Sequence, residues 1–272
     1  MEIFAVVLIA FLFGICSSLY WGTSSSAAIL RRVDATLRMM KPLKPAYRNL
    51  LNRYFPYYAK LEPAKKREFE KRLKYFLLKK EFIPRNMKLV TGEMKLLIGA
   101  CAVQLTFGFK PLKLAHFNKI VLYPREYYRQ KSRRRYKFKG EVSTEGTIVL
   151  SWEDFLKGYS ISDDGFNLGL HEMAHALRLE DAIMNDEYAF LEVKDLHHWN
   201  RVASKEFYRV KNGESSFLRA YAGTNMEEFF AVCVEQFFEQ PCDFRSTLPV
   251  LYKATVRLLR QDPCEGKYSP AV

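Results

Sequence analysis

The chain has 272 residues, which is enough for one large domain or two modest ones with a buried core. Its 13 Gly and 11 Pro are too few for a fibrous or a disordered protein, so both classes are excluded. Lys and Arg number 43 against 30 Asp and Glu, and the resulting net charge of +13 favours an anionic partner, either phospholipid head groups or nucleic acid.

The amino terminus predicts a membrane anchor. Residues 3–22 contain no charged side chain, and a helix of that length spans about 30 Å of hydrocarbon. The flank that follows is basic, so the positive-inside rule places the rest of the chain in the cytoplasm. We therefore predict a single-pass anchor of the inner (plasma) membrane at residues 1–25 and a basic linker at residues 26–44. A cleaved secretory signal and a buried core helix are the alternatives.

The cysteines point to the same location. They are odd in number, widely spaced and without a CxxC pair: Cys16, Cys101, Cys233, Cys242 and Cys264. This pattern argues against a disulfide scaffold and against a cysteine zinc site, and it favours a reducing compartment.

Helices are expected directly after the linker. Residues 45–83 carry two stretches with apolar residues at three- and four-residue spacing, and Pro63 suits a first helical turn. Residues 91–105 predict a core helix that Thr91 caps. Short β-branched and aromatic stretches then predict two strands, at residues 120–123 and 147–152.

A basic stretch lies between the two predicted strands. It begins at Arg129, ends at Lys139 and contains no acidic residue. It is either a solvated loop or hairpin, or a contact for anionic lipid, to which each basic residue near the surface adds about 1 kcal/mol. Tyr136 and Phe138 interleave it, but no recognised nucleic-acid fold accompanies it, which disfavours nucleic acid as a partner.

The rest of the chain is predicted to be helical, with helices near residues 165–178, 195–210, 225–238 and 247–259. The fold class is therefore α+β, mostly helical with a small β-sheet. We expect one domain at residues 45–262, followed by a tail at 263–272. Within that domain, a helical part at 45–110 precedes a part at 111–262 that holds the motifs described next.

Residues 171–175 read His-Glu-Met-Ala-His. On a helix, positions i and i+4 share a face, so His171 and His175 can bind one metal ion while Glu172 points toward the adjoining cleft. This spacing is a zinc-hydrolase signature. The alternative is a pair of surface or capping histidines.

Zinc needs a third protein ligand, and a catalytic site leaves the fourth position open. Glu228 is the preferred candidate, with helix capping and solvent exposure as the alternative. Thr224 or Asn225 forms a capping box that begins a helix there. Glu235 lies two turns further along the same face, where it can support a ligand histidine, whereas Glu227 is assigned to capping or solvent. Other histidines available as ligands are His116, His197 and His198.

These motifs resemble the Mlc titration factor A (MtfA) family of zinc-dependent peptidases. Family members carry HExxH and a later E-F-F-A-V-x-x-E-x-F-F-x-x-P segment, which matches residues 228–241 here. The likeness extends in order over most of residues 45–245. A more distant similarity is to the catalytic domain of anthrax lethal factor, in which a Tyr seven residues before a ligand Glu introduces a similar helix.

The resemblance implies a zincin-like, gluzincin-like metallopeptidase fold with the small β-sheet beside the HExxH helix. It implies one Zn2+ per chain bound by His171, His175 and Glu228. It also implies that Glu172 is the general base and that Tyr221 stabilises the transition state. The chain departs from the family in two places: residues 176–178 are Ala, Leu and Arg where members often have a hydrophobic residue and Asp, and the soluble members lack the predicted anchor.

We therefore predict a membrane-anchored zinc metallopeptidase acting on peptides or exposed protein termini. Zinc-bound water attacks the carbonyl, Glu172 passes the proton to the leaving amine and Tyr221 donates to the oxyanion. The strand at residues 147–152 is a candidate edge to which an extended peptide adds, an interior strand being the alternative.

A second function is a non-catalytic or weakly catalytic regulatory protein that binds and sequesters a transcription factor, as the family name suggests. The presence of Glu172 counts against it, because a structural zinc site has no use for a general base. Nucleic-acid binding through the basic stretch is a third and disfavoured function.

Overall fold

The computed structural model describes residues 41–109, 114–131, 134–161, 163–183, 191–214 and 216–266. The chain divides into two compact units, Met1–Leu43 and Lys44–Val272, and the second is described below. The predicted anchor, most of the predicted linker and the end of the tail lie outside the described residues. Within the described ranges, no helix combines the length and the apolar character needed to cross a membrane.

The second unit opens with three helices that each begin with proline: α3 (Pro45–Tyr54), α4 (Pro56–Ala59) and α5 (Pro63–Lys79). Proline suits this place because the first turn of a helix does not use its missing N–H. The sequence predicts helix as far as residue 83, and this boundary is wrong. Strand β1 (Glu81–Pro84) begins there instead, because the chain is extended before Pro84 and pairs parallel to strand β2 (Lys119–Tyr123).

Helix α6 (Gly92–Thr106) lies in the core, as its apolar sequence predicts. Thr91 caps it as expected, since its Oγ1 accepts the N–H of Met94 at 3.2 Å. Every residue from 96 to 106 is buried, and the helix packs against both α5 and α8 (Leu168–Ile183). The helix that carries the HExxH motif therefore rests on a fully buried support.

The sheet has four strands in the order β1-β2-β6-β5. Strands β2 and β6 (Thr147–Ser151) are the two that the sequence predicts, and β1, β2 and β6 are parallel. Strand β5 (Gly140–Ser143) runs antiparallel to β6 and forms one edge. The hypothesis that the strand at 147–152 is an edge is therefore wrong: β6 lies between β2 and β5, both of which use its backbone hydrogen bonds.

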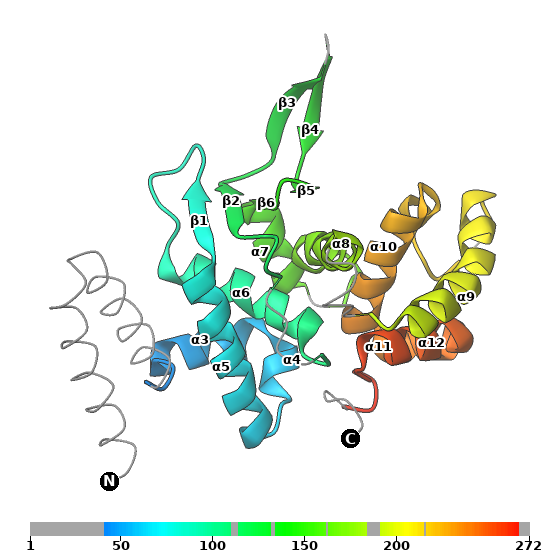
Figure 1. Ribbon diagram of the computed structural model, residues 1–272, viewed down its shortest axis with the longest axis horizontal. Helices are drawn as coiled ribbons and strands as arrows, with labels where there is room; N and C mark the ends of the chain where they lie inside the picture. Colours follow the sequence, from blue (N-terminus) through cyan, green and yellow to red (C-terminus); the bar gives the residue numbers. More distant parts are fainter. Residues whose placement is uncertain are drawn as a thin grey trace, which may run out of the picture. The chain divides into compact units, whose positions relative to one another are not determined.

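The basic stretch forms most of a separate hairpin. Strand β3 (Tyr127–Lys131) pairs antiparallel with β4 (Arg134–Phe138). Of the predicted alternatives, the hairpin is the one that the structure contains, and Figure 1 shows it continuing from the sheet at β5. Whether it contacts anionic lipid stays a prediction.

Strand β6 passes directly into α7 (Trp152–Ser160), so the predicted strand ends one residue early. Ser151 is the reason, because its Oγ accepts the N–H of Asp154 at 3.3 Å and donates to its carboxylate at 2.6 Å. A side chain that satisfies the first turn in this way starts a helix.

The carboxy-terminal part is helical, as predicted. It consists of α9 (Val193–Lys211), the 3-10 turn η1 (Ala220–Gly223), α10 (Met226–Glu239), α11 (Pro241–Thr247) and α12 (Pro249–Leu259). Helix α10 packs along α8 (Figure 1). The buried ring of Trp199 contacts Phe229 and Phe230, and its Nε1 donates to Thr255 at 3.0 Å. This contact ties α9, α10 and α12 into one core.

Cys242 and Cys264 form a disulfide with their Cα atoms 5.1 Å apart. The sequence argued against a disulfide scaffold and did not predict this bond, whereas Cys101 and Cys233 are free and buried. Spacing along the chain gave no sign of the bond, because the fold brings the segment after α12 back against the start of α11. The bond also removes the cysteine argument for a reducing compartment, since disulfides persist in oxidising ones.

Candidate functional site

Two imidazoles lie on one face of α8. Asn167 caps this helix by accepting the N–H of Leu170 at 2.9 Å, so His171 falls in its first turn and His175 in the next. The two Nε2 atoms are 3.1 Å apart, as the i, i+4 spacing predicts.

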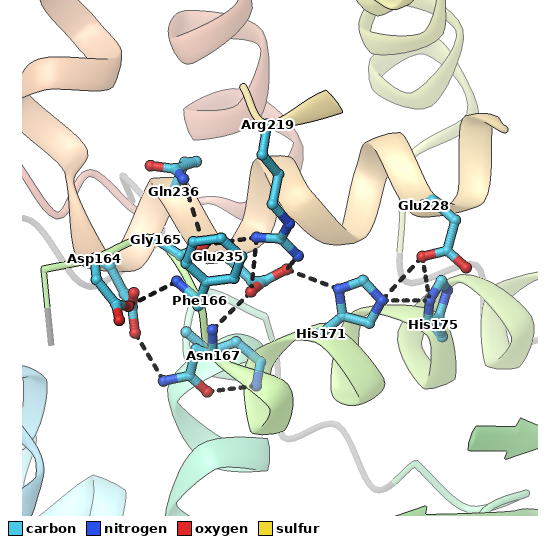
Figure 2. Close-up of polar contacts among 12 residues, drawn as sticks. Asp164, Gly165, Phe166, Asn167, His171, His175, Arg219, Glu228, Glu235 and Gln236 are labelled. Carbon is cyan, nitrogen blue, oxygen red and sulfur yellow. Dashed lines mark hydrogen bonds and ion pairs between the residues drawn. The ribbon is translucent and has the colours of Figure 1, made fainter. Parts of the chain in front are cut away.

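Helix α10 supplies the third group. Asn225 is its N-cap and accepts the N–H of Glu228 at 2.8 Å, which sets Glu228 at the start of the helix. Oε2 of Glu228 lies 3.0 Å from Nε2 of His171 and 3.4 Å from Nε2 of His175 (Figure 2). The fold thus brings the three predicted ligands together, and all three donor atoms lie within 4.8 Å of one another.

The other candidate ligands lie outside this cluster. His116 contacts the carbonyl of Thr144 at 2.7 Å, and His198 contacts Arg201 on α9. His197 is exposed on the same helix. Glu227 lines the cavity beside the cluster without joining it.

Glu235 orients the ring of His171. Its carboxylate is 2% exposed, and Oε1 lies 2.7 Å from Nδ1 of His171. Arg219 and the backbone N–H of Asn167 donate to the same carboxylate, at 2.5 and 2.7 Å (Figure 2). A carboxylate at Nδ1 keeps the proton on that nitrogen and leaves the Nε2 lone pair facing the cluster, an arrangement common behind metal-bound histidines.

The sequence reasoning missed two residues of this arrangement. Arg219 lies in an irregular segment before η1, and no local pattern marks it as a partner of Glu235. Asn167 could have been found, because an Asn directly before an apolar helical stretch is an N-cap signal.

The electrostatics of the cluster call for a cation between these groups. Burial alone would lower the pKa of His171, but the close contact with the Glu228 carboxylate and the hydrogen bond to Glu235 outweigh it and raise the pKa to about 9. Burial opposes the charged form of Glu228 as well, yet its contacts with both imidazoles hold its pKa well below the usual range. With neither a metal ion nor a second proton on His171, the Nε2 lone pairs of both imidazoles would face the carboxylate oxygen.

A divalent metal ion fits these residues. Two imidazole nitrogens and one carboxylate oxygen are a donor set that proteins use for catalytic zinc. Oε2 of Glu228 is buried and accepts no well-directed hydrogen bond from any described residue, although it faces both rings. A metal ion would satisfy that oxygen and both lone pairs at once.

Glu172 lies beside the cluster and is 5% exposed. Burial raises its pKa to about 7, while the nearby imidazoles oppose that change. It faces β5 closely, because a Cβ on Gly140 would come within 2.6 Å of the Glu172 carboxyl carbon. The glycine therefore leaves room for this carboxylate at the sheet edge.

Tyr221 lies on η1, and its ring centre is 6.0 Å from that of His171. Burial, followed by the charge of Glu228, raises the pKa of Tyr221 to about 12. The phenol therefore stays protonated at neutral pH and remains a hydrogen-bond donor. It is 49% exposed, so a molecule in the adjoining cavity can reach it.

Two adjoining cavities, of 580 and 750 Å³, meet at the cluster. The residues that line both are Phe138, Gly140, His171, Glu172 and Tyr221. The cleft therefore extends to either side of the candidate metal ligands, with the edge strand β5 along one wall. An extended chain could pass the cluster without leaving the cleft.

Comparison with known proteins identifies relatives of this chain. The sequence profile of the glucose-regulated metallo-peptidase M90 family matches residues 29–260. An uncharacterized protein of Synechocystis sp. is 28% identical over 229 residues, which are 78% of this chain and 82% of that protein.

Mlc titration factor A of Salmonella agona is 32% identical over 132 residues, and that of Salmonella paratyphi B is 31% identical over the same length. Each alignment covers 46% of this chain and 49% of the relative, so the chain spans about half the length of these relatives. The resemblance to the Mlc titration factor A family is confirmed. The similarity to anthrax lethal factor and the zincin-like class of the fold stay predictions.

Replacing Glu235 tests the support of His171. We expect Glu235→Gln to weaken zinc binding by about tenfold or more, because the neutral amide no longer strengthens His171 as a donor. Zinc affinity is measured by competition with a chromophoric chelator. Glu227→Gln removes the same charge from the residue directly before Glu228, which is outside the cluster, and it should bind zinc as the unchanged chain does. Equal affinities for all three proteins would contradict the role given to Glu235.

Zinc affinity should also depend on pH. Below pH 9 the metal-free site holds a proton on His171, and zinc must displace it. Affinity should therefore rise by about tenfold per pH unit as the pH approaches 9 and then level off. The same competition assay between pH 6 and 9 measures this slope. An affinity that is constant over this interval would show that no proton is released from the site.

Proposed function

We propose that this chain, which belongs to the glucose-regulated metallo-peptidase M90 family, is a zinc-dependent peptidase that hydrolyses peptide bonds at the cluster of His171, His175 and Glu228. The observation that carries the proposal is the position of that cluster. It lies where two cavities meet, with a buried carboxylate, Glu172, and a phenol donor, Tyr221, in their shared wall. A structural metal site would need neither group.

A divalent ion held by these three residues would polarise a peptide carbonyl and acidify water, and zinc is the usual choice of this donor set. Glu172 accepts a proton and returns it to the leaving amine, a role to which its burial beside the cluster is suited because burial raises the pKa of the carboxyl. Tyr221 donates a hydrogen bond to the carbonyl oxygen as negative charge develops there. Glu235 and Arg219 hold His171 in place throughout.

The substrate would bind along β5 rather than β6. Gly140, Glu141 and Val142 of this edge strand line the 580 Å³ cavity. Among the described strands, β6 alone pairs with β5, and an extended peptide could add to the opposite side through main-chain hydrogen bonds, which give affinity without requiring a particular sequence. A cleft that runs along an edge strand suits peptides or exposed protein termini.

A second candidate function is the binding and sequestration of a regulator. The observation in its favour is the printed name of the Salmonella relatives, Mlc titration factor A, which describes titration of Mlc by those proteins. Glu172 favours the peptidase, because binding alone requires no buried base. A Glu172→Gln protein that loses all cleavage and keeps a regulator bound would show both functions in one chain.

The location proposed for this activity is the cytoplasmic face of the inner membrane, with residues 1–25 as a single-pass anchor and the basic hairpin near anionic lipid. The uncharged stretch at residues 3–22 and the basic flank support it. Carbonate extraction of membranes from cells that express the full chain should leave it in the pellet. Release into the supernatant would contradict the anchor.

Substitutions at the two shared groups test the mechanism. We expect Tyr221→Phe to lower kcat about a hundredfold without loss of zinc, because one oxyanion donor is removed and no ligand changes. Glu172→Gln should abolish turnover and keep zinc. Peptide cleavage and elemental analysis on the same preparations measure both. If zinc is lost with Tyr221→Phe, the phenol belongs to the metal site and its assigned role is wrong.

A further inference from the structure

Arg178 lies in the cleft on the same face of α8 as the histidines. It follows His175 by three residues, and Leu179 and Ala182 continue the face along the wall of the 580 Å³ cavity. Among the described residues that line this cavity, Arg178 is the only lysine or arginine. About one helical turn separates it from a candidate metal ligand, so its side chain lines the cavity beside the cluster.

Among the described residues, the guanidinium of Arg178 contacts an aromatic ring but pairs with no carboxylate. Its Cζ lies 5.3 Å from the ring centre of Phe230, and its Nη1 is buried with no hydrogen-bond partner among the described residues. Glu227 and Asp181 act on it only through their charge, since neither forms an ion pair with it in the described part of the chain. Asp181 is engaged elsewhere, where it accepts the N–H of Leu191 at 3.1 Å.

The other arginine beside the cluster differs in this respect. Arg219 lines the 750 Å³ cavity, but it donates to Glu235 and to the carbonyl of Gly165. Arg219 is therefore paired with the carboxylate that supports His171. A partly buried guanidinium that has lost water and gained no partner, as at Arg178, is costly unless a ligand pairs with it.

We propose that Arg178 is a specificity-determining residue that binds a carboxylate of the peptide substrate. The contact with Phe230 holds the guanidinium over the ring, and a carboxylate can take two parallel N–H bonds from such a group. Glu227 is one of four glutamates that line this cavity, and its charge acts on Arg178 and limits the preference without an ion pair to the guanidinium. The proposal rests on the peptidase function and adds a preference for acidic substrates.

The carboxylate has two possible sources: an Asp or Glu side chain close to the scissile bond, or the carboxy terminus of the peptide. Both present the same planar group to the fork. They are distinguished with labelled decapeptides in which Gln is replaced by Glu at one position at a time, each made with a free carboxylate and with an amide at its end.

The experiment measures peptide binding to the zinc-loaded Glu172→Gln chain by fluorescence anisotropy, so that binding is read without turnover. We expect one Glu position, or the free carboxy terminus, to strengthen binding by about tenfold. Adding Arg178→Gln should reduce that preference to less than about twofold, whereas adding Arg178→Lys should keep part of it. Arg53→Gln removes the same charge from an exposed position of α3 and should leave the preference unchanged.

Charge reversal guards against a merely structural effect. Arg178→Glu should reverse the preference at the same position, from Glu peptides to Lys peptides, while zinc content and melting temperature stay those of the parent. A structural residue could not gain a new preference in this way. Absence of any acidic preference in the parent, or its persistence in Arg178→Gln, would overturn the inference.

The peptidase function and the carboxylate specificity of Arg178 can be contradicted separately. If the unchanged chain cleaves peptides with no preference for carboxylates, the inference about Arg178 is wrong and the peptidase stands. If acidic peptides bind through Arg178 and the unchanged chain cleaves none, the peptidase is wrong and the binding specificity stands. A zinc-loaded chain that neither binds nor cleaves any peptide would overturn both.

Discussion

The buried carboxylate of Glu235 is the interaction on which the site depends. It joins α10 to α8 through His171 and the backbone of Asn167, and to the segment before η1 through Arg219. A carboxylate that is 2% exposed costs several kcal/mol unless charged and hydrogen-bonded partners surround it. Those partners fix the orientation of the His171 ring. The N-cap at Asn225 places Glu228 in the first turn of α10. The convergence of the three candidate ligands follows from these contacts, and the cleft around them follows from β5 lying along α8.

Much of the fold and of the site could be predicted because local rules decide them. The helix caps at Thr91 and Asn225 are single side-chain hydrogen bonds, which residue type and spacing predict. The i, i+4 histidines must share a face wherever they lie on a helix, and two carboxylates seven residues apart must do so as well. The ligand positions therefore needed only the assignment of two helices, which apolar periodicity provided.

The features that could not be predicted depend on pairing between distant parts of the chain. Residues 81–84 continue the helical pattern of the preceding sequence. They form a strand because they pair with β2. Strand β6 is interior because β5 pairs with it on the side away from β2. Nothing in the sequence of residues 147–152 indicates that pairing. Likewise, Arg219 and Glu235 are 16 residues apart in the sequence, and the two cysteines of the disulfide are 22 residues apart. In each case the partner, rather than the residue itself, decides the outcome.

The proposed peptidase function requires that His171, His175 and Glu228 form one metal site. Elemental analysis tests it most directly: the full chain and its Glu228→Ala variant are purified side by side, without added metal or chelator, and zinc is measured per chain. We expect about one zinc per unchanged chain and little in the variant, because loss of one of the three protein ligands weakens zinc binding. No zinc in either protein, or the same amount in both, would contradict it.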